Sequence, residues 1–77
     1  MMPALPPLLR GELIKVDGVM FYLLKVEALG DHTVLHLSAD GEWRASHKLH
    51  GTEDTTMKRD PRTRGWVVTG AILEEVQ

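Results

Sequence analysis

Residues 13–22 read LIKVDGVMFY and decide the fold, because they place Asp17-Gly18 between two short apolar runs. Asp-Gly is a favoured pair for a two-residue hairpin turn, in which both central residues need positive φ. This turn predicts that Ile14 lies opposite Phe21. The first half of the chain therefore starts with a β-hairpin, and the domain is expected to be mainly β.

Two further turns extend this hairpin into a four-stranded antiparallel meander. Gly30-Asp31 ends the second run, and the resulting register pairs Val26 with Leu35 and Leu24 with Leu37. The parity of the apolar positions supports this register, because a slip by one residue would turn every side chain to the other face.

The third turn, Ala39-Asp40-Gly41, is interpreted as a three-residue loop with Gly41 in the left-handed conformation. That loop pairs Leu37 with Trp43, and Leu35 with Ala45. The predicted core face then consists of Leu9, Leu13, Met20, Tyr22, Leu24, Val26, Leu35, Leu37, Trp43 and Ala45.

The opposite face is polar except at one apolar corner around the first hairpin. We expect this corner to be a candidate interface, because contiguous exposed apolar patches often mark contact sites. Contact with a second copy, contact with another protein and cover by the chain's own loop or C-terminal segment are the three alternatives. The corner consists of Ile14, Val16, Val19, Phe21 and Leu23.

The second half predicts a long loop over 49–65 and a final strand that starts at Trp66. A short helix within the loop, capped by Thr52 and ended by Pro61, is one expectation. Gly70 is interpreted as a bulge, with 71–76 continuing as a fifth strand, and a helix over 71–76 is the rival. The fifth strand would cover the meander in an SH3-like or OB-like small barrel or half-barrel.

Composition bounds the remaining classes. The 77 residues allow one domain, here 9–77 after a proline-rich arm at 1–8, and the net charge of −2 excludes a polybasic protein. The chain has no cysteine, which excludes disulfides and Cys-type zinc sites. No apolar run is long enough for a membrane span, and no signal peptide is expected, so a cytoplasmic location is the expectation.

Catalytic and metal-binding patterns are not expected. The glycines are spaced as turn residues, and alternation along a strand sends Ser46 and His47 to opposite faces. His32 and His36 lie four residues apart on a predicted strand, about 13 Å, which is too far to share one ion. We therefore predict no enzyme activity, no cofactor, no metal and no small-molecule substrate.

The clearest charged feature is a basic segment over 58–64, which Trp66 follows closely. It predicts a charged contact surface for another protein or, as the alternative, for a nucleic-acid backbone with base stacking. The predicted surface consists of Arg44, Lys48, Lys58, Arg59, Arg62, Arg64 and Trp66.

The resulting functional expectation is a small non-catalytic binding module that acts through protein–protein contacts as an accessory or regulatory protein. Self-association into a homo-oligomer is one form of this expectation. The alternative is a nucleic-acid-binding small β-barrel that uses the basic loop at 58–64.

Overall fold

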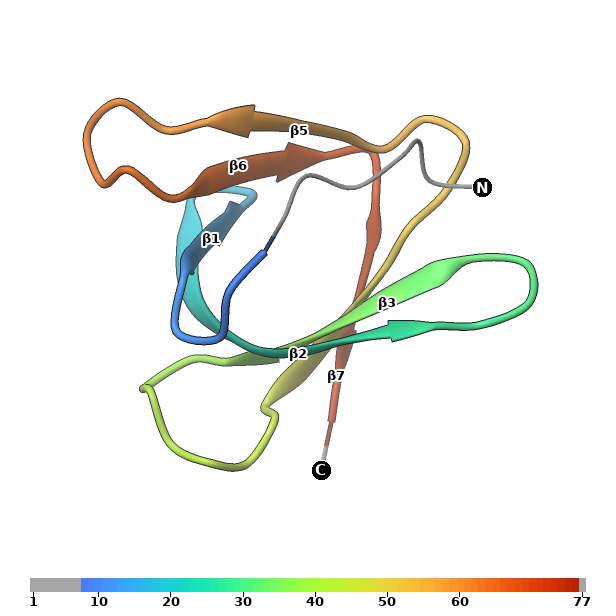
Figure 1. Cartoon of the computed structure of the whole chain (residues 1–77), viewed down its shortest axis with the longest axis horizontal. Coiled ribbons are helices and arrows are strands. Elements are labelled where there is room, and N and C mark those ends of the chain that lie inside the picture. The colour runs from blue at the N-terminus through green and yellow to red at the C-terminus, as the bar shows by residue number, and fades with distance from the viewer. Residues whose placement is uncertain (1–7, 77) are drawn as a thin grey trace.

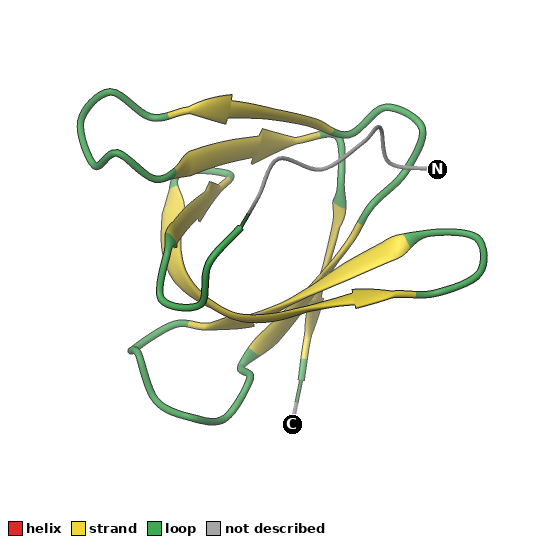
Figure 2. Cartoon of the chain, viewed as in Figure 1, coloured by secondary structure: helices red, strands yellow, loops and turns green. Residues whose placement is uncertain are grey.

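The computed structural model describes residues 8–76 as one β-sheet, with no helix in that range (Figure 2). The mainly β class is therefore confirmed. Most of the expected proline-rich arm at 1–8, and Gln77, lie outside the described residues. The seven strands are β1 (Leu13–Val16), β2 (Val19–Ala28), β3 (Thr33–Ser38), β4 (His47–His50), β5 (Thr56–Arg59), β6 (Trp66–Thr69) and β7 (Ile72–Glu75).

The strand order across the sheet is β5-β6-β1-β2-β3-β4-β7. Strands β1 to β4 are antiparallel neighbours in sequence order, as expected for a meander. The pairing of β6 with β1 is parallel, which makes the sheet mixed. Three strands rather than one follow the meander, so the second half of the chain contributes more to the sheet than the sequence indicated.

The first hairpin forms in the expected register. Ile14 lies opposite Phe21, and the turn residues Asp17 and Gly18 have φ of 51° and 81°. These left-handed values are the ones that a two-residue turn needs in order to follow the twist of the strands.

A β-bulge around Leu24 interrupts the pairing of β2 with β3. Leu37 lies opposite Leu23, so the expected Leu24–Leu37 pair is wrong, whereas the Val26–Leu35 pair beyond the bulge is confirmed. Because side chains alternate with a period of two, the extra residue moves every residue before it to the opposite face.

The bulge therefore exchanges core and surface in the first hairpin. Ile14, Val16, Phe21 and Leu23 of the candidate interface are buried at 4% exposure or less in a core that includes Trp66 and Val68, which agrees with the alternative of cover by the chain itself, and only Val19 of that set is exposed, at 51%. The hydrophobic core consists of Ile14, Val16, Phe21, Leu23, Leu35, Leu37, Leu49, Trp66 and Val68.

The predicted core face is correspondingly wrong over most of its length. Only two of its members, Leu35 and Leu37, are buried. The half-buried members are Leu13, Met20, Leu24 and Ala45. The exposed members are Leu9, Tyr22, Val26 and Trp43.

The connection after β3 is longer than expected. Gly41 has the predicted positive φ of 81°, but the next strand begins only at His47, which lies opposite Leu37. Trp43 therefore belongs to a loop over 39–46, and the predicted pairs of Leu37 with Trp43 and of Leu35 with Ala45 are wrong.

The expected long loop and short helix at 49–65 are replaced by β5 and its hairpin with β6. β-branched side chains favour strands, and here Thr56 and Thr69 lie directly opposite, with their hydroxyl oxygens 2.6 Å apart. Gly65 lies against the backbone of Leu13, where a Cβ atom would overlap the Leu13 carbonyl oxygen. This close approach allows β6 to lie beside β1.

The chain turns a corner at Gly70, which has φ of 75°. The next strand, β7, leaves the β5–β6–β1 part of the sheet and pairs with β4 on the other side of the core (Figure 1). The strand expected over 71–76 is thus confirmed and the rival helix is wrong, while Gly70 lies between two strands rather than within one.

The sheet curls around the core because β2 bends and the chain turns at Gly70 (Figure 1). Its two ends, β5 and β7, do not pair with each other, so the sheet is not closed. Residues 8–76 contain no helix that is long and apolar enough to cross a membrane.

Candidate functional site

The fold brings five of the seven residues of the predicted basic surface together on the β5–β6 hairpin. Lys58 and Arg59 lie on β5, Arg62 and Arg64 lie in the connecting loop, and Trp66 begins β6. The other two lie elsewhere: Lys48 is on β4 and Arg44 is in the 39–46 loop. Figure 1 shows this loop and the β5–β6 loop at different corners of the molecule.

In this hairpin, the side chains of Arg59 and Trp66 are engaged in contacts with other residues of the chain. The Arg59 guanidinium lies 4.1 Å from the Trp66 ring centroid, donates to the Arg64 carbonyl at 2.8 Å and forms an ion pair with Glu12 at 3.7 Å. Trp66 is only 8% exposed, and its indole N–H has no hydrogen-bond partner among the described residues. Trp66 is thus part of the core and not a platform on which a base could stack.

The loop of this hairpin is held by Asp60, which is buried. Its Oδ1 accepts a hydrogen bond from the Arg62 backbone N–H at 3.0 Å, and this bond is the main reason why the pKa of Asp60 is lowered. Arg64 has φ of 63°, which completes the turn. The loop therefore presents Arg62 and Arg64 to solvent in a defined conformation.

A second surface was not predicted, and it centres on Trp43. The Trp43 side chain is 80% exposed, and the Arg10 guanidinium lies over its ring at 3.9 Å from the centroid. An open groove of ≈ 540 Å³ runs beside it, lined by Tyr22 and Leu24 as well as by Arg10. We refer to Arg10, Tyr22, Leu24 and Trp43 as the Trp43 surface.

The Trp43 surface lies at the bend of β2, between the chain segment before β1 and the 39–46 loop. A second hollow of ≈ 380 Å³ extends it along β2 and β3, past Lys25, His36 and Ala45. The surface is therefore mainly aromatic and aliphatic, with cationic groups at its border.

Sequence reasoning missed this surface because it placed Trp43 and Tyr22 in the core. One signal could have found it: the segment Asp40-Gly41-Glu42-Trp43-Arg44 has the glycine and charge content of a loop. A three-residue turn, in contrast, keeps the apolar residues on one face, and this pattern favours a core position for Trp43.

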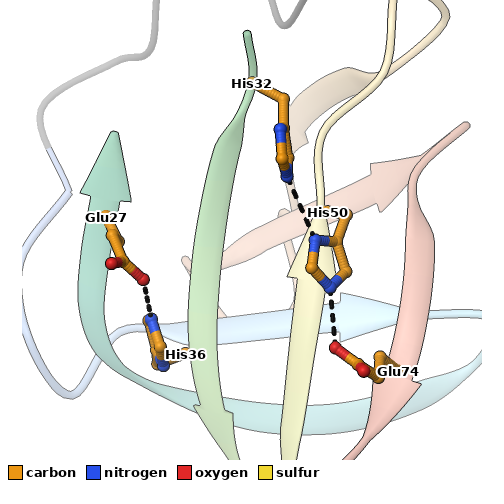
Figure 3. Close-up of polar contacts among 5 residues, drawn as sticks. All are labelled: Glu27, His32, His36, His50 and Glu74. Atoms are coloured by element: carbon orange, nitrogen blue, oxygen red, sulfur yellow. Dashed lines mark hydrogen bonds and ion pairs between the residues drawn. The ribbon is translucent and has the colours of Figure 1, made fainter. Parts of the chain in front are cut away.

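Four side chains, those of Asp31, His32, His50 and Glu74, form a hydrogen-bonded chain near β3, β4 and β7, and Figure 3 shows the last three of them. Asp31 Oδ1 lies 2.7 Å from His32 Nδ1, His32 Nε2 lies 3.3 Å from His50 Nδ1, and His50 Nε2 lies 2.8 Å from Glu74 Oε1. These contacts link the turn before β3 to β4, and β4 to β7.

The two carboxylates at the ends of this hydrogen-bonded chain have lowered pKa values. The hydrogen bonds from His32 and His50 lower the pKa of Asp31 and Glu74, respectively. A separate pair, His36 with Glu27 at 2.8 Å, lowers the pKa of Glu27 in the same way. All three carboxylates are exposed, so these contacts are surface interactions.

Two observations concern the residues considered for metal binding and catalysis. Within residues 8–76, no group of three or more histidine, aspartate and glutamate side chains is arranged to hold a metal ion. Ser46 Oγ lies 2.8 Å from His47 Nδ1, so the expectation that these two side chains point apart is wrong. The same Oγ accepts a hydrogen bond from the Ala39 N–H, and the contact therefore closes the base of the 39–46 loop.

Comparison of the chain with protein-family models, with curated proteins and with solved structures finds no match. The functional argument below therefore depends only on the surfaces of this chain.

Proposed function

We propose that this chain is a small non-catalytic binding module that contacts another protein through the Trp43 surface. The observation that carries the proposal is an 80% exposed tryptophan held in place by an arginine beside a groove lined by Tyr22 and Leu24. Tryptophan, tyrosine and arginine are the residues most enriched among those that dominate binding energy at protein interfaces.

The contact of Arg10 with Trp43 supports this role in a second way. A guanidinium over an aromatic face is attracted by the ring quadrupole, which restrains both side chains before a partner arrives. Side chains that are already ordered lose less conformational entropy on binding. The cations Arg10 and Lys25 line the groove and the hollow that extends it, so the partner that fits is a protein segment with apolar side chains next to acidic ones.

A selection from random peptides displayed on phage tests this function. Peptides that combine aliphatic or aromatic residues with aspartate or glutamate are expected to be enriched, and Trp43→Ala should weaken their binding by about 30-fold or more. Val19→Ala, a change at an exposed apolar residue outside the surface, is the matched control and should bind like the wild type. Equal binding by Trp43→Ala and the wild type would remove the Trp43 surface as the site.

A nucleic-acid backbone is the second candidate partner, and the β5–β6 hairpin favours it. Lys58 on β5 is exposed there together with Arg62 and Arg64, which lie on the loop held by buried Asp60. If these groups contact phosphates, replacing Arg62 and Arg64 by alanine should flatten the slope of log affinity against log salt by about 1.8. Absence of binding to single- and double-stranded oligonucleotides at low salt would eliminate this candidate.

Two further expectations belong to the same proposal. We propose that the curled, unclosed sheet is a half-barrel form of the SH3-like or OB-like small barrels, since it wraps a single core but leaves two edges unpaired. The absence of cysteine from the chain supports a cytoplasmic location for the module.

A further inference from the structure

The two ends of the sheet, β5 and β7, each pair on one side only within the described residues. Strand β5 pairs with β6, and β7 pairs with β4. A strand with an unpaired side presents a row of backbone N–H and C=O groups that can pair with another chain. Both edges of this sheet are therefore available for strand addition.

Neighbouring hydrogen bonds show which backbone groups point outward. The Asp60 N–H donates to Gly65, toward β6, and the Val76 N–H donates to Ser46, toward β4. Successive residues of a strand direct their backbone groups to alternate sides. The outward-facing groups are therefore those of Met57 and Arg59 on β5, and those of Leu73 and Glu75 on β7.

The same alternation determines how the two edges can meet. Met57 and Leu73 both pack against the core, so the residues with outward backbone groups have their side chains on the inner face at both edges. If the inner face continues across the junction, inner-face residues of β5 lie opposite inner-face residues of β7, and both have outward backbone groups. Two residues that lie opposite each other can both direct their backbone groups toward the partner strand only in an antiparallel pair. Strands β5 and β7 must therefore pair antiparallel.

One chain cannot make this pair with itself. The starts of β5 and β7 are held at one corner, where the Thr55 hydroxyl donates to the Gly70 carbonyl at 3.1 Å. Figure 1 shows both strands leaving this corner and diverging. Two strands that start together can meet only in parallel, so the antiparallel partner of each edge must come from another molecule.

The charges of the two edges are opposite. Strand β5 ends in Lys58 and Arg59, and β7 ends in Glu74 and Glu75. In the antiparallel register that places Lys58 opposite Glu74, Arg59 is the diagonal neighbour of Glu75. Opposite charges at such positions stabilise a strand pair, whereas β5 with β5 or β7 with β7 would bring like charges together.

We propose that copies of this chain associate by antiparallel pairing of β5 of one copy with β7 of the next. The contact joins two different edges, so each copy keeps one free edge of each kind, and repetition produces a ring or a filament. This contact lies outside the Trp43 surface and does not depend on the proposed function.

Two charge reversals test the proposal by analytical ultracentrifugation at low salt, where exposed charge pairs are least screened. Lys58→Glu alters the β5 edge and Glu75→Lys alters the β7 edge, and neither side chain has an ion-pair partner among the described residues. The wild type should assemble beyond a dimer, and each variant should associate about tenfold more weakly. Arg62→Glu and Glu53→Lys make the same charge changes away from the edges and should assemble like the wild type.

An equimolar mixture of the two variants gives the sharpest result. Lys58→Glu retains an intact β7 edge and Glu75→Lys retains an intact β5 edge, so the mixture should form a one-to-one dimer and stop there.

As a second β7 variant, Glu75→Pro removes an outward-facing donor without affecting the pairing with β4, and should also block growth. A monomeric wild type at high concentration, or a mixture that assembles like the wild type, would overturn the proposal. Loss of assembly in Trp43→Ala would overturn it as well.

Discussion

At the scale of single residues, Phe21 and Val19 show how neighbouring apolar side chains have different roles. Phe21 is 2% exposed in the core, and Val19, two residues earlier, is 51% exposed at the hairpin turn. Both belong to the apolar corner that the sequence presented as one surface. Their burial and not their hydrophobicity determines what each contributes.

This difference predicts opposite outcomes for the same substitution. Phe21→Glu should unfold the protein, because loss of a buried phenylalanine costs about 3–5 kcal/mol and burial of an unpaired charge adds to this cost. Val19→Glu should change the free energy of unfolding by less than about 0.5 kcal/mol. Circular dichroism and urea denaturation distinguish the two, and a folded Phe21→Glu variant would show that the core assignment is wrong.

The two tryptophans make the same point for aromatic residues. Each has an arginine guanidinium over its ring, Arg10 over Trp43 and Arg59 over Trp66. Trp66 is nevertheless buried at the base of a hairpin, whereas Trp43 is exposed in a loop. The arginine contact alone does not distinguish these cases, since Trp66 is buried by the strands that pack around it and Trp43 lies in the 39–46 loop.

At the scale of elements, the corner at Gly70 determines how the last strand reaches β4. The chain there needs a positive φ, and the Cα lies against the Asp54 carbonyl, where a Cβ would overlap it. The hydroxyls of Thr52 and Thr55 donate to the Gly70 carbonyl and hold the corner to the start of β5. A glycine is thus required both by conformation and by space.

Gly70→Ala should therefore destabilise the fold by about 1–3 kcal/mol, the usual cost of holding a non-glycine residue in a sparsely populated conformation. Gly30→Ala is the control, because Gly30 has no positive φ and open space at its Cβ position. Urea denaturation should place the midpoint of Gly70→Ala well below that of the wild type and leave that of Gly30→Ala close to it. Equal midpoints would contradict the role of Gly70 in the corner.

At the scale of the whole molecule, three histidine–carboxylate contacts link stability to pH. Hydrogen bonds from His36, His32 and His50 lower the pKa of Glu27, Asp31 and Glu74 below 4.5, 3.8 and 4.5. The unfolded chain therefore takes up protons before the folded chain does as the pH falls. The stability from these contacts is fully present above the unfolded values and is lost as the pH falls through the lower folded values.

Between about pH 5 and pH 3, the free energy of unfolding should therefore decrease. The double variant Glu27→Gln with Glu74→Gln should show a flatter dependence over the same interval, because two of the three carboxylates no longer titrate. The control Glu42→Gln alters a glutamate for which no histidine contact is present in the described residues. Thermal melts across this interval measure the difference, and parallel curves for the wild type and the double variant would contradict it.

The sequence by itself determined the β class, the first hairpin and the register near the tip of the second hairpin. These features depend on turn residues such as Asp17-Gly18 and on pairs only a few residues apart, such as Val26 with Leu35. Local backbone preferences are strong enough to decide such contacts without the rest of the chain. The strand over 72–75 was also predicted, although its partner was not.

Only the tertiary structure decided which face of the first hairpin is buried and therefore where the candidate sites lie. Strand β2 is apolar on both faces from Val19 to Leu24, so periodicity alone does not select the inner face. The bulge at Leu24 selects it, by placing Leu23 opposite Leu37 and leaving Tyr22 outside beside the groove at Trp43. The pairing of β6 with β1 joins segments about fifty residues apart, and such long-range contacts follow from the packing of the whole core and not from local sequence.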